Sequence, residues 1–277
     1  MNVTIFGASG LLGQSLMREW RGDELTGLGK SDADIRDASQ VQSVVQRANP
    51  DWIILAAAYT DVDGCESNRD LAFAVNRDGA VNVANAAKQV GATLLFLSSD
   101  YVFDGRKTTP YETTDARNPQ SIYGRSKAEA EVRLLELMPA CCVLRTSWLF
   151  GTGGKCFPDT ILKLAVSRPA LDVVNDQRGS PTYVVDLART IMQLCRKDAS
   201  GIVHVTNAGE CTWFEFAREI VHCAGLSTQV RPVSSEKMAR PAPRPAYSVL
   251  SPKSLHSFGI EMPHWRDALR RYLAEPK

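Results

Sequence analysis

Short apolar runs alternate with helix-forming segments through the first half of the chain. The runs that predict buried strands cover residues 2–6, 24–28, 52–55, 92–97 and 142–149. Segments typical of helices lie between them, at 14–20, 39–48, about 70–90 and 123–131. Strands that alternate with helices build a parallel sheet with right-handed crossovers. The pattern therefore predicts an α/β fold, a Rossmann-like doubly wound parallel sheet.

The pattern changes beyond Gly151. Helices are expected at 157–166, 185–196, 213–224 and 264–273, and a strand at 201–206, separated by polar stretches that contain glycine and proline. Residues 1–150 are therefore predicted to form one domain and residues 151–277 a smaller C-terminal lobe, with 181–206 returning to the parallel sheet.

A glycine-rich turn follows the first predicted strand. The sequence GASGLLG places Gly7, Gly10 and Gly13 between that strand and a helix, which is the context of the dinucleotide fingerprint. Glycines let the backbone turn tightly and approach a pyrophosphate, and the helix N-terminus offers unpaired N–H groups to it. The turn predicts a dinucleotide site rather than a plain strand-to-helix connection.

The end of the second predicted strand bears on the choice of dinucleotide. An acidic residue there holds the ribose hydroxyls of NAD, whereas a cation suits the 2′-phosphate of NADP. Lys30 and Ser31 favour NADPH, while the nearby Asp32 and Asp34 favour NADH. We therefore expect NADPH as the cofactor, with NADH also possible.

Three side chains share a chemical use. Tyr123 and Lys127 are four residues apart in a predicted helix and so lie on one face, and Ser99 follows the strand before it. A nearby cation stabilises a phenolate and lowers its pKa from the usual value of about 10. A serine hydroxyl can hold a carbonyl oxygen beside the phenol while a hydride arrives at its carbon. The spacing alone is also common on solvated surface helices, so the interpretation depends on the rest of the chain.

The composition narrows the class of partners. The 277 residues include 44% hydrophobic and 23% charged side chains with a net charge of +1, so nothing favours a nucleic-acid or membrane partner. No apolar run reaches the length of a transmembrane helix, and the first residues predict a strand rather than an export signal. The seven cysteines and four histidines lack metal-ligand spacing. We therefore expect reduced thiols, no bound metal and a cytoplasmic location.

Six motifs together resemble the extended short-chain dehydrogenase/reductase family. They are GASGLLG, AAAYT, SSDYVFDG, YGRSK, RTSWLF and NDQRGSPT. Within the family, SSDYVF, RTSW and NDQRGSPT are similar to the branch that reduces the C4 keto group of dTDP-4-dehydro-L-rhamnose to give dTDP-L-rhamnose, with NADPH. The resemblance implies that residues 1–150 bind the dinucleotide, that the C-terminal lobe binds the nucleotide sugar, and that the chain is a monomer or a homodimer.

The resemblance also implies roles for individual residues. Tyr123 would donate the proton, and Lys127 would lower its pKa and contact the nicotinamide ribose. Ser99 stands where the family usually has threonine, and it would bind the substrate together with Asp100 and Trp148. The cofactor-binding positions are Gly10, Leu11, Leu12, Asp34, Ile35, Ala58, Tyr59 and Thr60, to which the glycine turn adds Gly7 and Gly13 and the second strand adds Lys30.

Two other functions fit parts of this pattern. A non-catalytic cofactor-binding subunit, similar to the regulatory subunit of methionine adenosyltransferase, would share the fold and some motifs. A nucleotide-sugar epimerase or dehydratase would also share the fold, but a dehydratase commonly needs an acidic pair beside the active serine, and Asp100 alone does not supply it. Arg240 and Arg244, in an irregular segment, are equally compatible with a substrate phosphate and with a solvated loop.

We predict that activity does not need a divalent metal. Some relatives form magnesium-bridged dimers through glutamates, one of which lies two residues past the third glycine, where this chain has Ser15. Magnesium is usually held by carboxylates, so NADPH oxidation should survive treatment with EDTA. A loss of activity in EDTA that added magnesium restores would contradict this prediction.

Overall fold

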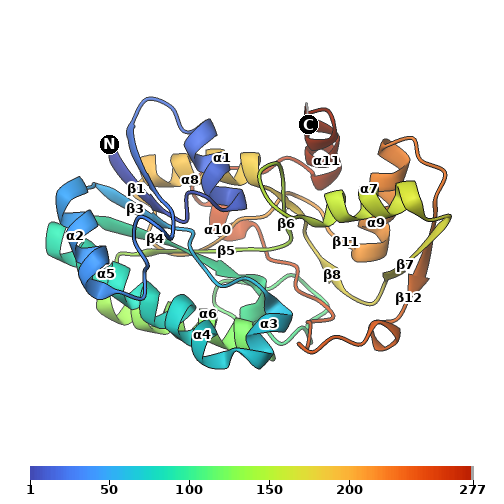
Figure 1. The fold of residues 1–277 in the computed structure, drawn as a ribbon, viewed down its shortest axis with the longest axis horizontal. Coiled ribbons are helices and arrows are strands. Elements are labelled where there is room, and N and C mark those ends of the chain that lie inside the picture. Colours follow the sequence, from blue (N-terminus) through green and yellow to red (C-terminus); the bar gives the residue numbers. More distant parts are fainter. Residues whose placement is uncertain (276–277) are drawn as a thin grey trace.

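The structure, a computed structural model that describes residues 1–275, is built on a six-stranded parallel sheet (Figure 1). The strands are β1 (Asn2–Phe6), β2 (Glu24–Leu28), β3 (Trp52–Leu55), β4 (Thr93–Ser99), β5 (Cys142–Thr146) and β10 (Gly201–His204). Their spatial order is β10-β5-β4-β3-β1-β2, and every neighbouring pair is parallel. The chain runs outward from β1 to β2 and then crosses to β3 on the other side of β1. The predicted doubly wound, Rossmann-like fold is confirmed.

Helices cover both faces of the sheet because successive strand residues point to opposite sides. On one face, Ile5 and Ile54 pack against α1 (Leu11–Glu19) and α8 (Val184–Arg196). On the other face, strand residues such as Ile53 and Phe96 pack against α2 (Ala38–Ala48), α5 (Gly79–Val90) and α6 (Ile122–Leu137). Figure 1 shows these two layers on either side of the strands. They hold the strand ends, and the connections that follow them, in fixed positions.

The helix expected at about 70–90 is interrupted. The chain forms α3 (Val62–Ser67), α4 (Arg69–Phe73), a π-helical turn at Ala74–Asp78 and then α5. A π-turn holds one more residue than an α-turn and is frequent at functional sites. Asn76 lies within this turn and is only 1% exposed.

The strand predicted at 142–149 is shorter than expected. β5 ends at Thr146, and after two residues β6 (Leu149–Phe150) pairs with β9 (Thr182–Tyr183) outside the main sheet. Trp148 turns the chain at this point with a φ of +48°, a left-handed value. Ser147 Oγ donates to the carbonyl of Ser180 at 2.7 Å, so the distant segment draws the chain out of the sheet.

The C-terminal part forms a second apolar core. It is built by α7 (Phe157–Ser167), α9 (Trp213–Cys223) and α11 (Trp265–Leu273) with the strand pairs β7 (Ala170–Val174)–β12 (Gln229–Val233) and β8 (Arg178–Gly179)–β11 (Cys211–Thr212). The short helices at Asp100–Val102, Ser235–Met238 and Lys253–His256 (α10) complete the elements. The predicted return to the sheet is seen at β10, which pairs with β5. The division into domains at residue 150 stays a prediction.

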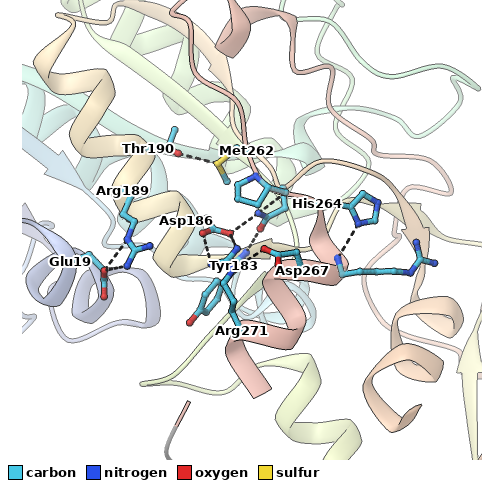
Figure 2. A network of polar contacts seen from close by, with 12 residues as sticks. Glu19, Tyr183, Asp186, Arg189, Thr190, Met262, His264, Asp267 and Arg271 are labelled. Carbon is cyan, nitrogen blue, oxygen red and sulfur yellow. Dashed lines mark hydrogen bonds and ion pairs between the residues drawn. The ribbon is translucent and has the colours of Figure 1, made fainter. Parts of the chain in front are cut away.

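A polar network fastens α11 to α8 (Figure 2). Asp186, which is 6% exposed, accepts hydrogen bonds from Arg271 at 2.8 and 2.7 Å and from Asn207 at 2.8 Å. Arg189 pairs with Glu19 at 2.8 Å, so α8 is also tied to α1. Within residues 1–275, no helix is long and apolar enough to cross a membrane.

The network predicts which acidic residue stabilises this end of the fold. Replacing the buried Asp186 by alanine removes a partner that Arg271 and Asn207 share, and it should lower the free energy of unfolding by about 2 kcal/mol in urea denaturation. Asp267→Ala is the matched control, because Asp267 is an exposed partner of the same arginine. That change should cost less than about 0.5 kcal/mol. Equal costs would contradict the assignment.

Candidate active site

A cleft of about 810 Å³ runs along the carboxyl ends of the strands from β1 to β5. Parallel strands bring all these ends to one edge of the sheet, where open α/β folds bind their ligands. Every site residue predicted from the sequence lines the cleft: Gly7, Gly10, Leu11, Leu12, Gly13, Lys30, Asp34, Ile35, Ala58, Tyr59, Thr60, Ser99, Asp100, Tyr123, Lys127 and Trp148. The structure therefore brings them together, while the role of each stays a prediction.

The glycine turn fits a dinucleotide pyrophosphate. A Cβ on Gly13 would lie 2.0 Å from the carbonyl oxygen of Gly7, so only glycine allows this close approach. Gly10 is the N-cap of α1, and no side chain caps that helix. The first turn of α1, which begins at Leu11, lines the cleft, so its N–H groups are open to an anion.

The carboxylates beyond β2 are both engaged within the chain. Asp32 accepts a hydrogen bond from the N–H of Gly29 at 2.7 Å. Asp34 binds Arg36 with contacts of 2.5 and 3.0 Å, and this hydrogen bonding lowers the pKa of Asp34 to about 2. Lys30 is exposed and lines the cleft beside them. The two acidic residues that the sequence sets against NADPH therefore have other partners.

Asn76 joins the segment after β3 to the helix that carries Tyr123. Its Oδ1 accepts from the N–H of Tyr59 at 2.8 Å, and its Nδ2 donates to the carbonyl of Tyr59 at 3.1 Å and to Ser126 Oγ at 3.0 Å. Ser126 in turn donates to the carbonyl of Tyr123 at 2.8 Å. The π-turn thus places one amide where it aligns two walls of the cleft.

Ser99 is hydrogen-bonded on both sides at the end of β4. It donates to Asp100 Oδ1 at 2.9 Å and accepts from the N–H of Tyr101 at 3.2 Å. Burial raises the pKa of Asp100 to about 6, and hydrogen bonds from Ser248 and Ser99 oppose that rise. Because Ser99 has one proton, it must release Asp100 before it can donate to a substrate oxygen.

Burial works against the lowering of the Tyr123 pKa that the sequence leads us to expect from Lys127. Tyr123 and Lys127 lie one turn apart on α6 as predicted, but burial raises the pKa of Tyr123, and the opposing effect comes from Ser99 rather than from Lys127. Lys127 is buried as well, since it is only 2% exposed. Burial lowers the pKa of Lys127 to about 7 and so favours the neutral amine.

Two stacked tryptophans form one end of the cleft. The rings of Trp148 and Trp213 lie 3.5 Å apart at their centroids, with 9° between their planes. A Cβ on Gly179 would lie 2.6 Å from the Trp148 ring, so the glycine in the NDQRGSPT segment leaves room for it. Trp148 thus combines a left-handed backbone with a ring that stacks on Trp213.

The comparisons with known proteins agree with this geometry. The family described as the RmlD substrate binding domain matches residues 1–277. The chain belongs to this family. Its members include sugar-nucleotide reductases, and the chain is an enzyme of this NAD(P)-dependent dTDP-sugar reductase family.

Among RmlD relatives, the chain is 41% identical to the dTDP-4-dehydrorhamnose reductase of Mycobacterium tuberculosis (strain ATCC 25618 / H37Rv), over 99% of this chain and 93% of that protein. It is also 41% identical to the spore coat polysaccharide biosynthesis protein SpsK of Bacillus subtilis (strain 168), over 99% of this chain and 97% of that protein. The crystal structure of dTDP-4-dehydrorhamnose reductase from Bacillus anthracis str. Ames in complex with NADP superposes with a TM-score of 0.97 at 42% identity, covering 99% of each chain.

Several cleft residues of this RmlD-family chain were missed in the sequence. Arg36, Lys155 and Trp213 line the cleft. Arg36 and Lys155 could have been found as cations near predicted ligand-binding turns, whereas Trp213 lies in a distant helix and carries no local signal. Asn76 could have been suspected as an amide inside an apolar helix.

Arg240 and Arg244 have a role that was not considered. Both bind Asp63 on α3, at 3.2 and 3.0 Å, so the irregular C-terminal segment closes against the segment that follows β3. Arg240 stays largely exposed and Arg244 is mostly buried, and a contact with a substrate phosphate stays a prediction.

The site predicts a large loss of activity when Tyr123 is changed to phenylalanine. The change removes one oxygen and little volume, so the fold and cofactor binding should persist. Loss of a positioned acid should slow single-turnover NADPH oxidation by roughly 10²–10⁴-fold. Tyr247→Phe is the control, because the Tyr247 hydroxyl donates to Glu210 outside the cleft. Turnover near that of the wild type in Tyr123→Phe would remove this residue from the mechanism.

Proposed function

We propose that the chain uses NADPH to reduce the C4 keto group of dTDP-4-dehydro-L-rhamnose, giving dTDP-L-rhamnose in the cytoplasm. The observation that carries the proposal is that one cleft contains Ser99, Tyr123 and Lys127 together with the glycine turn before α1, whose N-terminus has no side-chain cap. The name of the M. tuberculosis relative supports this choice of sugar.

In this reaction the side chains of the cleft control a proton. NADPH, when bound, supplies the hydride that forms the new bond at C4. Negative charge then builds on the C4 oxygen, where Tyr123 donates a proton and Ser99 donates a hydrogen bond. Lys127 acts beside the phenol and the nicotinamide ribose, and Asp100 and Trp148 position the sugar. The products are the alcohol and oxidised NADP.

The charges after β2 support NADPH over NADH. A carboxylate free to bind ribose hydroxyls would favour NADH, but Asp32 and Asp34 are held by Gly29 and Arg36. Lys30 is left facing the cleft as a cation for the 2′-phosphate. The NADP in the B. anthracis structure is consistent with this preference.

A second candidate differs only in the sugar. The dTDP-4-keto-6-deoxy-D-glucose reductase of Streptomyces niveus is 37% identical over 96% of this chain and 94% of that protein. A non-catalytic cofactor-binding subunit is less well supported, because nothing in it would require a serine, a tyrosine and a lysine together in the cleft.

Steady-state oxidation of NADPH with each sugar tests the proposal. We expect a higher kcat/KM with dTDP-4-dehydro-L-rhamnose than with dTDP-4-keto-6-deoxy-D-glucose. A preference for the second sugar would favour the activity named for the S. niveus relative. Tight NADPH binding without turnover of any nucleotide sugar would favour the non-catalytic subunit.

Cofactor preference yields a separate prediction. Lys30→Gln should lower kcat/KM for NADPH by roughly tenfold, a loss of about 1.4 kcal/mol, and leave that for NADH unchanged. Lys88→Gln, which changes an exposed lysine on α5 outside the cleft, is the control and should change neither value. Tighter binding of NADH than NADPH by the wild type would refute the preference.

A further inference from the structure

The buried side of α6 holds charges that the proposed mechanism does not use. Glu131 follows Lys127 by four residues, as Lys127 follows Tyr123, so the three lie along one face of the helix. The Glu131 carboxylate is fully buried. Its hydrogen-bond donors are Arg145 at 2.9 and 2.6 Å, Arg117 at 2.5 Å and Ser98 at 2.5 Å.

Glu131 is held in its ionised form. Burial alone would raise its pKa, but the hydrogen bonds and charges of Arg145 and Arg117 outweigh burial and leave the pKa below its usual value. Two guanidinium groups and the hydroxyl of Ser98, a residue that lines the cleft, therefore keep this carboxylate ionised inside the protein.

At Lys127, one helical turn away, burial and a neighbouring charge act in opposite directions. Its Nζ is 4.4 Å from the centroid of the Phe96 ring, and the side chain is almost completely buried. Burial favours the neutral amine, and the Glu131 carboxylate is the charge that favours the ammonium form. An amine that has lost its proton cannot stabilise a phenolate, so the charge of Lys127 matters for the chemistry at Tyr123.

We propose that Glu131 is a positioning residue whose buried carboxylate keeps Lys127 protonated at the pH of the reaction. The proposal rests on the function proposed above, since it assigns Lys127 to the reacting group. It also assigns a role to Arg145 and Arg117, which keep Glu131 ionised. Because Glu131 is hydrogen-bonded to these arginines, the ammonium group of Lys127 stays available to the cleft.

Other titratable groups around α6 do not replace Glu131. His204 on β10 is 3.3 Å from Arg145, and burial lowers the pKa of His204 to about 3, so it is neutral. Burial likewise keeps Tyr123 neutral. Other charged or titratable groups that contact α6 or its buried side include Asp100 and Tyr101 after β4, Cys65 and Glu66 on α3, Arg77 in the π-turn, which pairs with Glu129 on α6, and Arg117 and Arg145 themselves.

The experiment is an NMR titration of Lys127 in protein labelled with ¹³C at lysine Cε. The Lys127 signal is identified as the one that disappears in Lys127→Arg. In Glu131→Gln the titration midpoint should fall by roughly one pH unit, because an opposite charge at close range has been removed. The alkaline limb of the pH profile of kcat/KM should move down by the same amount, which means about tenfold lower activity at a fixed pH above the midpoint.

Arg117→Gln is the matched control, since it removes a partner of the same carboxylate but keeps its charge and its pair with Arg145. Its Lys127 midpoint should not fall. Because Glu131→Gln leaves two arginines without their carboxylate, the double variant E131Q/R117Q is measured beside it and should show the same fall.

An unchanged midpoint in the folded variants that lack Glu131 overturns the proposal, as does an equal fall in Arg117→Gln. A purely structural role for Glu131 would lower activity without moving the midpoint. The titration does not depend on turnover, so a wild type that oxidises no NADPH would refute the proposed function while the midpoints still decide the role of Glu131.

Discussion

The buried ion pair between Glu131 and Arg145 fixes α6 to the sheet, and the geometry of the cleft depends on that helix. Arg145 lies on β5, so the pair joins the helix to the strand, and Ser98 adds a contact from β4. A buried charge that loses its partner costs roughly 3–5 kcal/mol. These partners therefore tie α6, which carries Tyr123, to β5 and to β4, which ends at Ser99.

The parts of the fold that the sequence predicted are those decided by nearby residues. The strand, glycine turn and helix at the start of the chain are of this kind, as is the four-residue spacing of Tyr123 and Lys127. The early end of β5 is different, because it depends on contacts of Ser147 with Ser180 and of Trp148 with Trp213. No local pattern reveals a partner that distant folding brings into place, and the same holds for the contact of Asn76 with Tyr59.

The electrostatics of the cleft illustrate a second limit of sequence reasoning. A count of charges after β2 suggests opposing preferences, but it does not show that Asp32 and Asp34 accept hydrogen bonds from Gly29 and Arg36. At Tyr123 burial works against the pKa lowering expected from Lys127, and burial cannot be read from residue types. Residue types identified the groups that lie together in the cleft, but the charge states of these groups depend on their burial and on their hydrogen-bond and ion-pair partners.

The π-turn at Ala74–Asp78 has a consequence for how the chain can change in length. Five residues in a π-turn carry the chain around the helix axis about as far as four residues do in an α-helix, so α4 and α5 keep nearly the relative rotation of one continuous helix. Deleting one residue from the turn would therefore let an ordinary α-helix form and leave the buried Phe73 and Val83 facing the core. The deletion would instead move Asn76 away from its contacts with Tyr59 and Ser126. The extra residue thus matters for the alignment of the cleft walls rather than for the packing of the helix.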